Sequence, residues 1–135
     1  MHLYLDSSAL IKRVVLEPES AQFVEFLDEH SRRDDLLVSS SLAWVEVSRA
    51  VLARAKSPDA GELIDSALSG VDERPMISDV ISLARRIEPL VLRSLDAIHL
   101  ATAVLIDADL VVTYDDRLAD ACRRNSLAVA MPGRD

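Results

Sequence analysis

Short apolar runs alternate along this chain with longer stretches in which apolar residues recur every three or four positions. The short runs predict buried strands, and the longer period predicts amphipathic helices. The predicted strands are His2–Asp6, Leu36–Ser39, Glu73–Ile77, Leu110–Thr113 and Leu127–Ala130. The predicted helices are Ser7–Val15, Pro18 to about His30, a helix capped by Ser40 or Ser41 that ends near Lys56, Ala60–Ser69, Ser78 to about Arg86, Leu95–Ile106 and Asp115–Arg124.

Short strands separated by helices predict a parallel, doubly wound α/β sheet. The stretch from Ser40 to Gly70 has no strand pattern, so we expect a pair of helices between two strands there. The chain has 135 residues, half of them hydrophobic, and only three glycines. That is enough to bury a core, and we expect one domain spanning residues 1–135.

The composition excludes several classes of protein. The single cysteine, Cys122, cannot form an internal disulfide, and we expect it to be buried in a helix. The start of the chain lacks the basic segment of a secretory signal, and no apolar run reaches the roughly 18 residues of a membrane span. We therefore expect a cytoplasmic protein. The net charge of −8 excludes a protein that coats nucleic acid nonspecifically through a basic face.

Two acids directly follow predicted strands. Asp6 comes after Leu3–Leu5, and Asp115 comes after Leu110–Tyr114. The carboxyl ends of strands in an open α/β sheet form the edge at which ligands bind. An aspartate before a helix can also serve as an N-cap, so both acids admit a structural role. Either Asp115 or the adjacent Asp116 is expected to cap the next helix, and we prefer Asp115 for the site.

Two further acids lie on predicted helices with apolar faces. Glu46 shares its helix face with small and apolar residues, and a charge there needs a partner. That partner is either a metal or polar cluster, or Arg49 in a local ion pair. Asp96 lies in the first turn of a helix that is apolar on nearly all sides, so it is either a functional acid or a charge matched to the helix dipole.

All four acids can reach one edge of the predicted sheet. Four carboxylates massed there would repel one another, and a divalent cation removes that conflict. All-oxygen ligation, with no paired Cys or His, favours Mg²⁺ or Mn²⁺ over Zn²⁺. The sequence therefore predicts a metal site formed by Asp6, Glu46, Asp96 and Asp115, of the kind that hydrolyses phosphodiesters.

Several residues near these acids have an alternative structural explanation. His99 is expected to be a buried, hydrogen-bonded histidine rather than a ligand, and Trp44 to pack in the core or against a second subunit. Substrate phosphates would need positive charge close to the acids. The candidates, each of which could instead be a solvated surface charge, are Lys12, Arg13, Arg85, Arg86, Arg93 and Arg117.

The acids occur in segments that resemble the PIN-domain family, specifically the VapC-type toxins of bacterial toxin–antitoxin pairs. The matching segments are Leu5-Asp6-Ser7-Ser8-Ala9-Leu10, the helix around Glu46, Ser94-Leu95-Asp96-Ala97-Ile98-His99-Leu100-Ala101-Thr102-Ala103 and Leu110-Val111-Val112-Thr113-Tyr114-Asp115. The resemblance covers essentially the whole chain, and the segment around Asp96 is its most specific part.

The resemblance implies a three-layer α/β/α sandwich around a five-stranded parallel sheet. It implies Mg²⁺-dependent endonucleolytic cleavage of RNA, a small antitoxin partner whose tail blocks the site, and a homodimer. It also implies that Ser7 and Thr113, which match polar family positions, orient water or ligands.

Two other functions fit acids at strand ends. A metal-dependent phosphatase or phosphoacceptor domain would transfer phosphate to Asp6, although this chain lacks the neighbouring second acid that such a phosphatase uses. A non-catalytic binding module would keep the fold and bind a partner protein without binding Mg²⁺ or Mn²⁺.

Overall fold

The computed structural model describes residues 1–54 and 58–134. The strands are β1 (His2–Leu5), β2 (Leu36–Ser40), β3 (Val71–Arg74), β4 (Leu110–Val112) and β5 (Val129–Ala130). The helices are α1 (Ser7–Leu10), the 3-10 turn η1 (Ile11–Arg13), α2 (Ser20–Arg32), α3 (Ser41–Arg54), α4 (Ala60–Leu68), α5 (Ser78–Ala84), α6 (Ser94–Leu105) and α7 (Asp116–Arg124).

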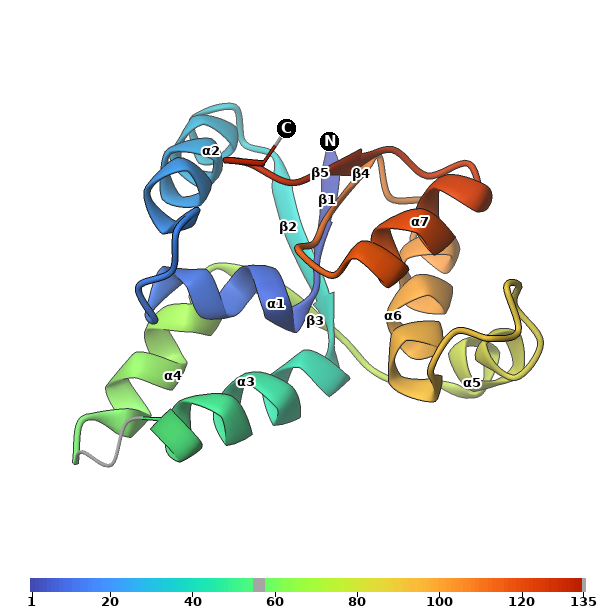
Figure 1. The fold of residues 1–135 in the computed structure, drawn as a ribbon, viewed down its shortest axis with the longest axis horizontal. Helices are drawn as coiled ribbons and strands as arrows, with labels where there is room; N and C mark the ends of the chain where they lie inside the picture. Colours follow the sequence, from blue (N-terminus) through green and yellow to red (C-terminus); the bar gives the residue numbers. More distant parts are fainter. Residues whose placement is uncertain (55–57, 135) are drawn as a thin grey trace.

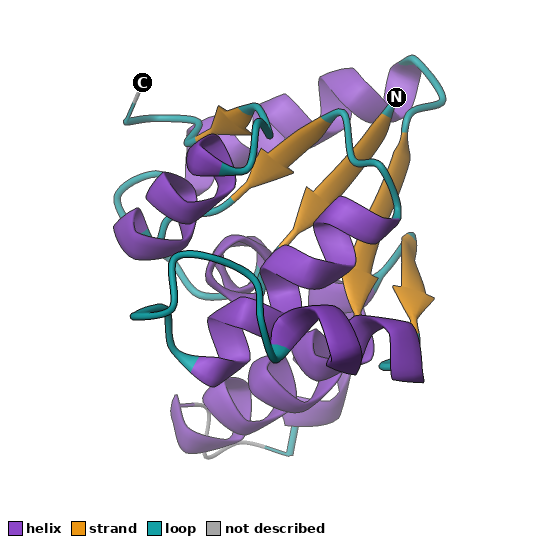
Figure 2. Cartoon of the chain, turned by 90° about the vertical axis from the view of Figure 1, so that its right-hand side faces the viewer, coloured by secondary structure: helices purple, strands orange, loops and turns teal. Residues whose placement is uncertain are grey.

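The strands form one parallel sheet in the order β3-β2-β1-β4-β5. Leu3 in the central strand pairs with Leu37 of β2 on one side and with Leu110 of β4 on the other. Because neighbouring strands run in the same direction, their carboxyl ends lie along one edge (Figure 2). The predicted five-stranded parallel sheet is confirmed.

Helices cover both faces of the sheet, which gives the predicted three-layer sandwich (Figure 1). The helices α1 to α4 lie on one side of the sheet, and α5 to α7 lie on the other. Two hydrophobic cores lie on the two faces of the sheet, and successive side chains of β1 point to opposite faces. Leu3 and Leu5 therefore pack in the first core, and Tyr4 packs in the second. The predicted helical pair between two strands is also confirmed, because α3 and α4 follow β2 and precede β3.

The third strand lies earlier than predicted. It was expected at Glu73–Ile77, but the structure places it at Val71–Arg74, where Val71 pairs with Leu37. Gly70 has a φ of 74°, a left-handed turn that ends the preceding segment and lets pairing begin at once. Pro75 has no N–H to donate to the sheet, which accounts for the end of the strand.

The remaining differences lie at element ends. The helix α2 begins at Ser20 rather than Pro18, and the final strand is confined to Val129–Ala130. The predicted helix end near Lys56 lies outside the described residues. Cys122 is buried in α7, as expected, and Trp44 is half-buried against the first core. Among the helices of residues 1–54 and 58–134, none has the length and apolar character needed to cross a bilayer.

Candidate metal centre

Asp6 lies between the end of β1 and the start of α1, with only 4% of its surface exposed. Its Oδ1 accepts hydrogen bonds from the Ser8 hydroxyl at 2.7 Å and the Ala9 amide at 3.0 Å. Its Oδ2 accepts one from the Thr113 hydroxyl at 2.6 Å. Asp6 is therefore the N-cap of α1, and its second oxygen keeps a lone pair free for another partner.

Thr113 joins the first acid to the fourth. Its fully buried hydroxyl donates to Asp6 and accepts from the Asp115 amide at 3.1 Å. The Asp115 Oδ1 in turn caps α7 by accepting from the amides of Arg117 and Leu118. Asp115, and not Asp116, is thus the cap, and its Oδ2 has no hydrogen-bond partner in the described part of the chain.

Asp96 lies in the first turn of α6 and is half-buried. Its pKa is raised above the ordinary aspartate value, first by burial and then by repulsion from Asp115 and Asp6. Burial also raises the pKa of Asp6, although its hydrogen bonds and the neighbouring His99 act in the opposite direction. The structure therefore brings Asp6, Asp96 and Asp115 into one electrostatic neighbourhood.

Glu46 reaches this neighbourhood from α3 through a histidine. Its Oε1 lies 2.6 Å from His99 Nε2, and its side chain is 26% exposed. The ion pair with Arg49 that sequence reasoning left open is not formed within residues 1–54 and 58–134. His99 is 2% exposed and also contacts the Tyr4 hydroxyl, so the prediction of a buried, hydrogen-bonded histidine is confirmed.

The free oxygens of these acids fit a hard cation. Asp96 makes no side-chain hydrogen bond in the described residues, and Asp6, Glu46 and Asp115 each retain acceptor capacity. The carboxylates of Asp115 and Asp6 help to raise the pKa of Asp96, a nearby positive charge would relieve that repulsion, and oxygen donors suit Mg²⁺ or Mn²⁺. Across the described ranges, no three His, Cys, Asp or Glu side chains already converge as a coordination sphere. Cation binding therefore requires the carboxylates to move closer together.

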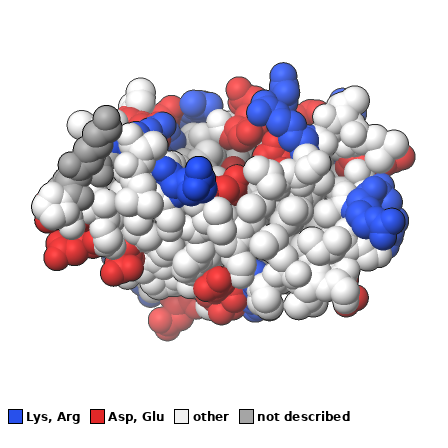
Figure 3. Space-filling model, turned by 90° about the horizontal axis from the view of Figure 1, so that it is seen from below, with Lys and Arg blue, Asp and Glu red and all other residues white. Residues whose placement is uncertain are grey.

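The edge that carries these acids is seen from below in Figure 3. Acidic side chains gather in a hollow near the middle of this face, and basic side chains lie beside them. A substrate phosphate entering the hollow would meet acids at its floor and positive charge at its rim. Such a charge distribution needs a cation at the floor before an anion can be held there.

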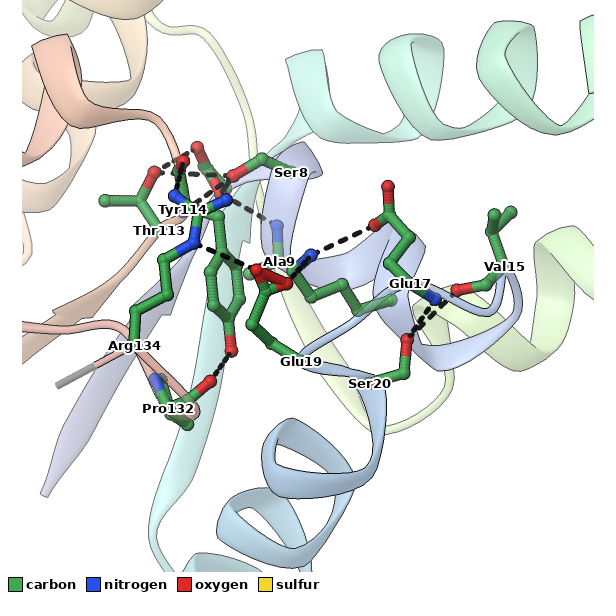
Figure 4. Close-up of polar contacts among 12 residues, drawn as sticks. Ser8, Ala9, Val15, Glu17, Glu19, Ser20, Thr113, Tyr114, Pro132 and Arg134 are labelled. Carbon is green, nitrogen blue, oxygen red and sulfur yellow. Dashed lines mark hydrogen bonds and ion pairs between the residues drawn. The ribbon is translucent and has the colours of Figure 1, made fainter.

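Ser8 is a residue that sequence reasoning missed. It donates to Asp6 and accepts from the Tyr114 amide at 3.0 Å, which ties α1 to the end of β4 (Figure 4). The adjacent Ser7, singled out by the family resemblance, makes no side-chain hydrogen bond within the described chain, and its role remains a prediction. The signal for Ser8 was its position two residues after a capping aspartate, where a hydroxyl can reach the carboxylate.

Lys12 and Arg13 are neither solvated charges nor positioned for substrate. Lys12 is 5% exposed and pairs with Glu19 at 3.0 Å, while its ammonium lies 4.3 Å from the centre of the Tyr114 ring. Arg134 also pairs with Glu19, and its guanidinium donates a hydrogen bond to the backbone carbonyl of Tyr114, the residue that precedes Asp115 (Figure 4). Arg13 donates to the backbone carbonyls of Ala67 and Ser69.

Comparisons with known proteins agree with this fold. The family model described as PIN domain matches residues 3–124. Ribonuclease VapC47 of Mycobacterium tuberculosis is 41% identical over 133 residues, which cover 97% of each chain. Ribonuclease VapC46 of the same species is 42% identical over 132 residues, covering 96% of this chain and 97% of the relative.

A solved structure of VapBC2 from Rickettsia felis, bound to a DNA fragment from its promoter, matches with a TM-score of 0.77 at 15% identity. The match covers 96% of this chain and 98% of that one. VapBC-5 from Mycobacterium tuberculosis, a member of the VapBC family of toxin–antitoxin systems, matches with a TM-score of 0.60 at 16% identity, covering 96% of this chain and 95% of that one.

Proposed function

The chain belongs to the PIN-domain family, among its VapC proteins, and on that premise we propose that it is a Mg²⁺-dependent endoribonuclease, with Mn²⁺ as an alternative ion. The proposal treats residues 1–135 as a single PIN-like domain. The observation that carries it is the electrostatic neighbourhood of Asp6, Asp96 and Asp115 at the carboxyl edge of the sheet. Its relatives VapC47 and VapC46, which are named ribonucleases, supply the substrate class.

Asp6, Asp96 and Asp115 would hold the principal cation through their free oxygens. A bound cation would supply Lewis-acid activation of water and stabilisation of charge on the phosphate oxygens. Glu46 orients the attacking water, accepts its proton or helps to hold a second ion. Thr113 fixes the Asp6 carboxylate, and the proposal keeps for Ser7 the role of orienting water or ligands that the family resemblance implies. Attack on the phosphorus leaves a 5′-phosphate and a 3′-hydroxyl.

Arg117 supplies positive charge for the RNA backbone. Its amide donates to Asp115, so it lies within one helical turn of the acids. Its guanidinium makes no ion pair with any described residue, and it lines a groove of about 400 Å³ together with Pro89, Val91, Leu92, Asp120 and Arg124.

Partners follow from the VapBC structures that share the fold. The chain is the toxin of a type II toxin–antitoxin pair, and a small antitoxin covers the acidic edge with its tail. The toxin forms a homodimer and acts in the cytoplasm. We expect a small antitoxin encoded by the adjacent gene to copurify with this chain when the two are coexpressed. We expect the resulting complex not to cleave RNA.

Mapping of cut sites in total RNA, with and without Mg²⁺, tests the proposed function. We expect discrete cuts with 5′-phosphate ends in Mg²⁺ and none in chelator. The proposal fails if the purified protein does not cut any RNA in Mg²⁺ or Mn²⁺. Transfer of phosphate to Asp6 would favour the phosphatase, and absence of Mn²⁺ binding by calorimetry would favour a non-catalytic module.

A further inference from the structure

A chain of hydrogen bonds links the central strand to Glu46. The Tyr4 hydroxyl of β1 lies 2.6 Å from His99 Nδ1 of α6, and His99 Nε2 lies 2.6 Å from Glu46 Oε1 of α3. Tyr4 is fully buried and His99 nearly so. Three elements that are distant in sequence therefore meet through one imidazole.

The donors in this chain can be assigned from the chemistry of its ends. An ionised carboxylate only accepts hydrogen bonds, so His99 Nε2 carries the hydrogen and donates to Glu46. In a neutral imidazole Nδ1 then accepts, and the Tyr4 hydroxyl is its donor. Burial raises the pKa of Tyr4 above its ordinary value, which keeps this hydroxyl protonated.

We propose that Tyr4 and His99 are positioning residues for Glu46. Tyr4 fixes one tautomer of His99, and His99 holds Oε1 of Glu46, which leaves Oε2 for the cation or the attacking water. Neither residue touches the reacting atoms. This inference rests on the proposed ribonuclease function. It means that the segment around Asp96 supplies both an acid and, through His99, the support for Glu46.

The need for such a support comes from the position of Glu46. A glutamate on a helix surface samples several rotamers, and Glu46 is still 26% exposed. Outer hydrogen bonds to metal-binding or water-orienting groups typically affect metal affinity or activity by about 10–100-fold. The pair formed with His99 restricts Glu46 to a rotamer in which Oε1 contacts His99 Nε2.

Substitutions of His99 separate positioning from packing. We expect His99→Leu to lower kcat for a defined RNA by about 10–100-fold while KM for RNA stays within about twofold. His99→Gln keeps an N–H donor toward Glu46 and should recover much of the loss. Tyr4→Phe keeps the ring and should cost less than His99→Leu. The matched control is His30→Gln, which alters another buried histidine paired with a carboxylate, Asp35, and should leave kcat unchanged.

A double-mutant cycle with Glu46→Gln provides the decisive readout. If His99 acts through Glu46, then His99→Leu causes little further loss once Glu46 is replaced. An equal loss in both backgrounds, or a His99→Gln variant no better than His99→Leu, overturns the proposal. Circular dichroism and unfolding midpoints of each variant confirm that the comparison is made on folded protein.

A spectroscopic test separates this proposal from the ribonuclease function itself. The ¹⁵N chemical shifts of His99, measured without RNA or metal, distinguish the two tautomers. We expect hydrogen on Nε2 in the wild type, and a mixture of tautomers in Tyr4→Phe. Hydrogen on Nδ1 in the wild type overturns the positioning chain even if RNA is cleaved, whereas the expected tautomer in a protein that cleaves no RNA refutes only the function.

Discussion

At the scale of single residues, the capping role of an acid leaves room for the proposed metal-binding role, although sequence reasoning treats the two as alternatives. Asp6 and Asp115 each cap a helix with one carboxylate oxygen and keep capacity on the other. The position after a strand therefore correctly indicated the capping role, and it leaves each acid an oxygen for the proposed site. The partner of Glu46 could not be predicted, because His99 is 53 residues away in the chain and only the sheet order brings α3 and α6 together.

Thr113 is the residue whose hydroxyl aligns two acids at once. We expect Thr113→Val, which keeps the shape and removes the hydroxyl, to lower RNA cleavage at least tenfold and stability by about 1–2 kcal/mol. Thr113→Ser should keep most of the activity. Cleavage rates and urea unfolding measure the two effects, and wild-type cleavage by the valine variant would show that the hydroxyl does not align the acids.

Glu19 predicts a dependence of stability on pH. Its pKa is lowered by the hydrogen bonds from Lys12 and Arg134, so its ionised form stabilises the fold. This contribution is present above the ordinary glutamate pKa and is lost as the pH falls through the lowered value. Glu19→Gln should unfold several degrees below the wild type at pH 6, and the gap should narrow at pH 3. Thermal midpoints at both pH values measure it, and a constant gap would refute the role of Glu19.

At the scale of elements, hydrophobic periodicity predicted every strand and helix, while the ends depended on interactions that periodicity does not contain. The third strand begins directly after the left-handed turn at Gly70, where its backbone can pair with β2. The helices α5 and α6 begin at Ser78 and Ser94, and neither helix has a side-chain cap. Helix α7, by contrast, is capped by Asp115.

A prediction for RNA binding concerns Arg117 in helix α7. In a Glu46→Gln background, which keeps Asp6, Asp96 and Asp115 and in which cleavage should be slow, Arg117→Gln should weaken binding of a labelled RNA and reduce the slope of log affinity against log salt by roughly 0.7–1, as expected for one lost phosphate contact. The control is Arg33→Gln, an exposed arginine paired with Glu29 on α2. Fluorescence anisotropy measures both, and equal salt slopes for the two variants would exclude Arg117 from the RNA interface.

At the scale of the whole molecule, the net charge of −8 is opposite in sign to the basic surface of a general RNA-binding protein. The charge was readable from the sequence, and so was the placement of acids at strand ends. Their mutual repulsion emerged only from the fold, because the order β3-β2-β1-β4-β5 places the ends of β1 and β4 side by side. Under the proposed function, a cation bound at the site would offset this repulsion and let a phosphate approach it.

The most direct test of the acid site compares cleavage of one labelled RNA by wild type, Asp96→Asn and Asp79→Asn, in Mg²⁺ and in chelator. Asp79 is the matched control, because it is also an acid in the first turn of a helix, α5, on the same side of the sheet. We predict Mg²⁺-dependent cleavage by wild type and Asp79→Asn, and none by a folded Asp96→Asn. Cleavage by Asp96→Asn at the wild-type rate would contradict the assignment.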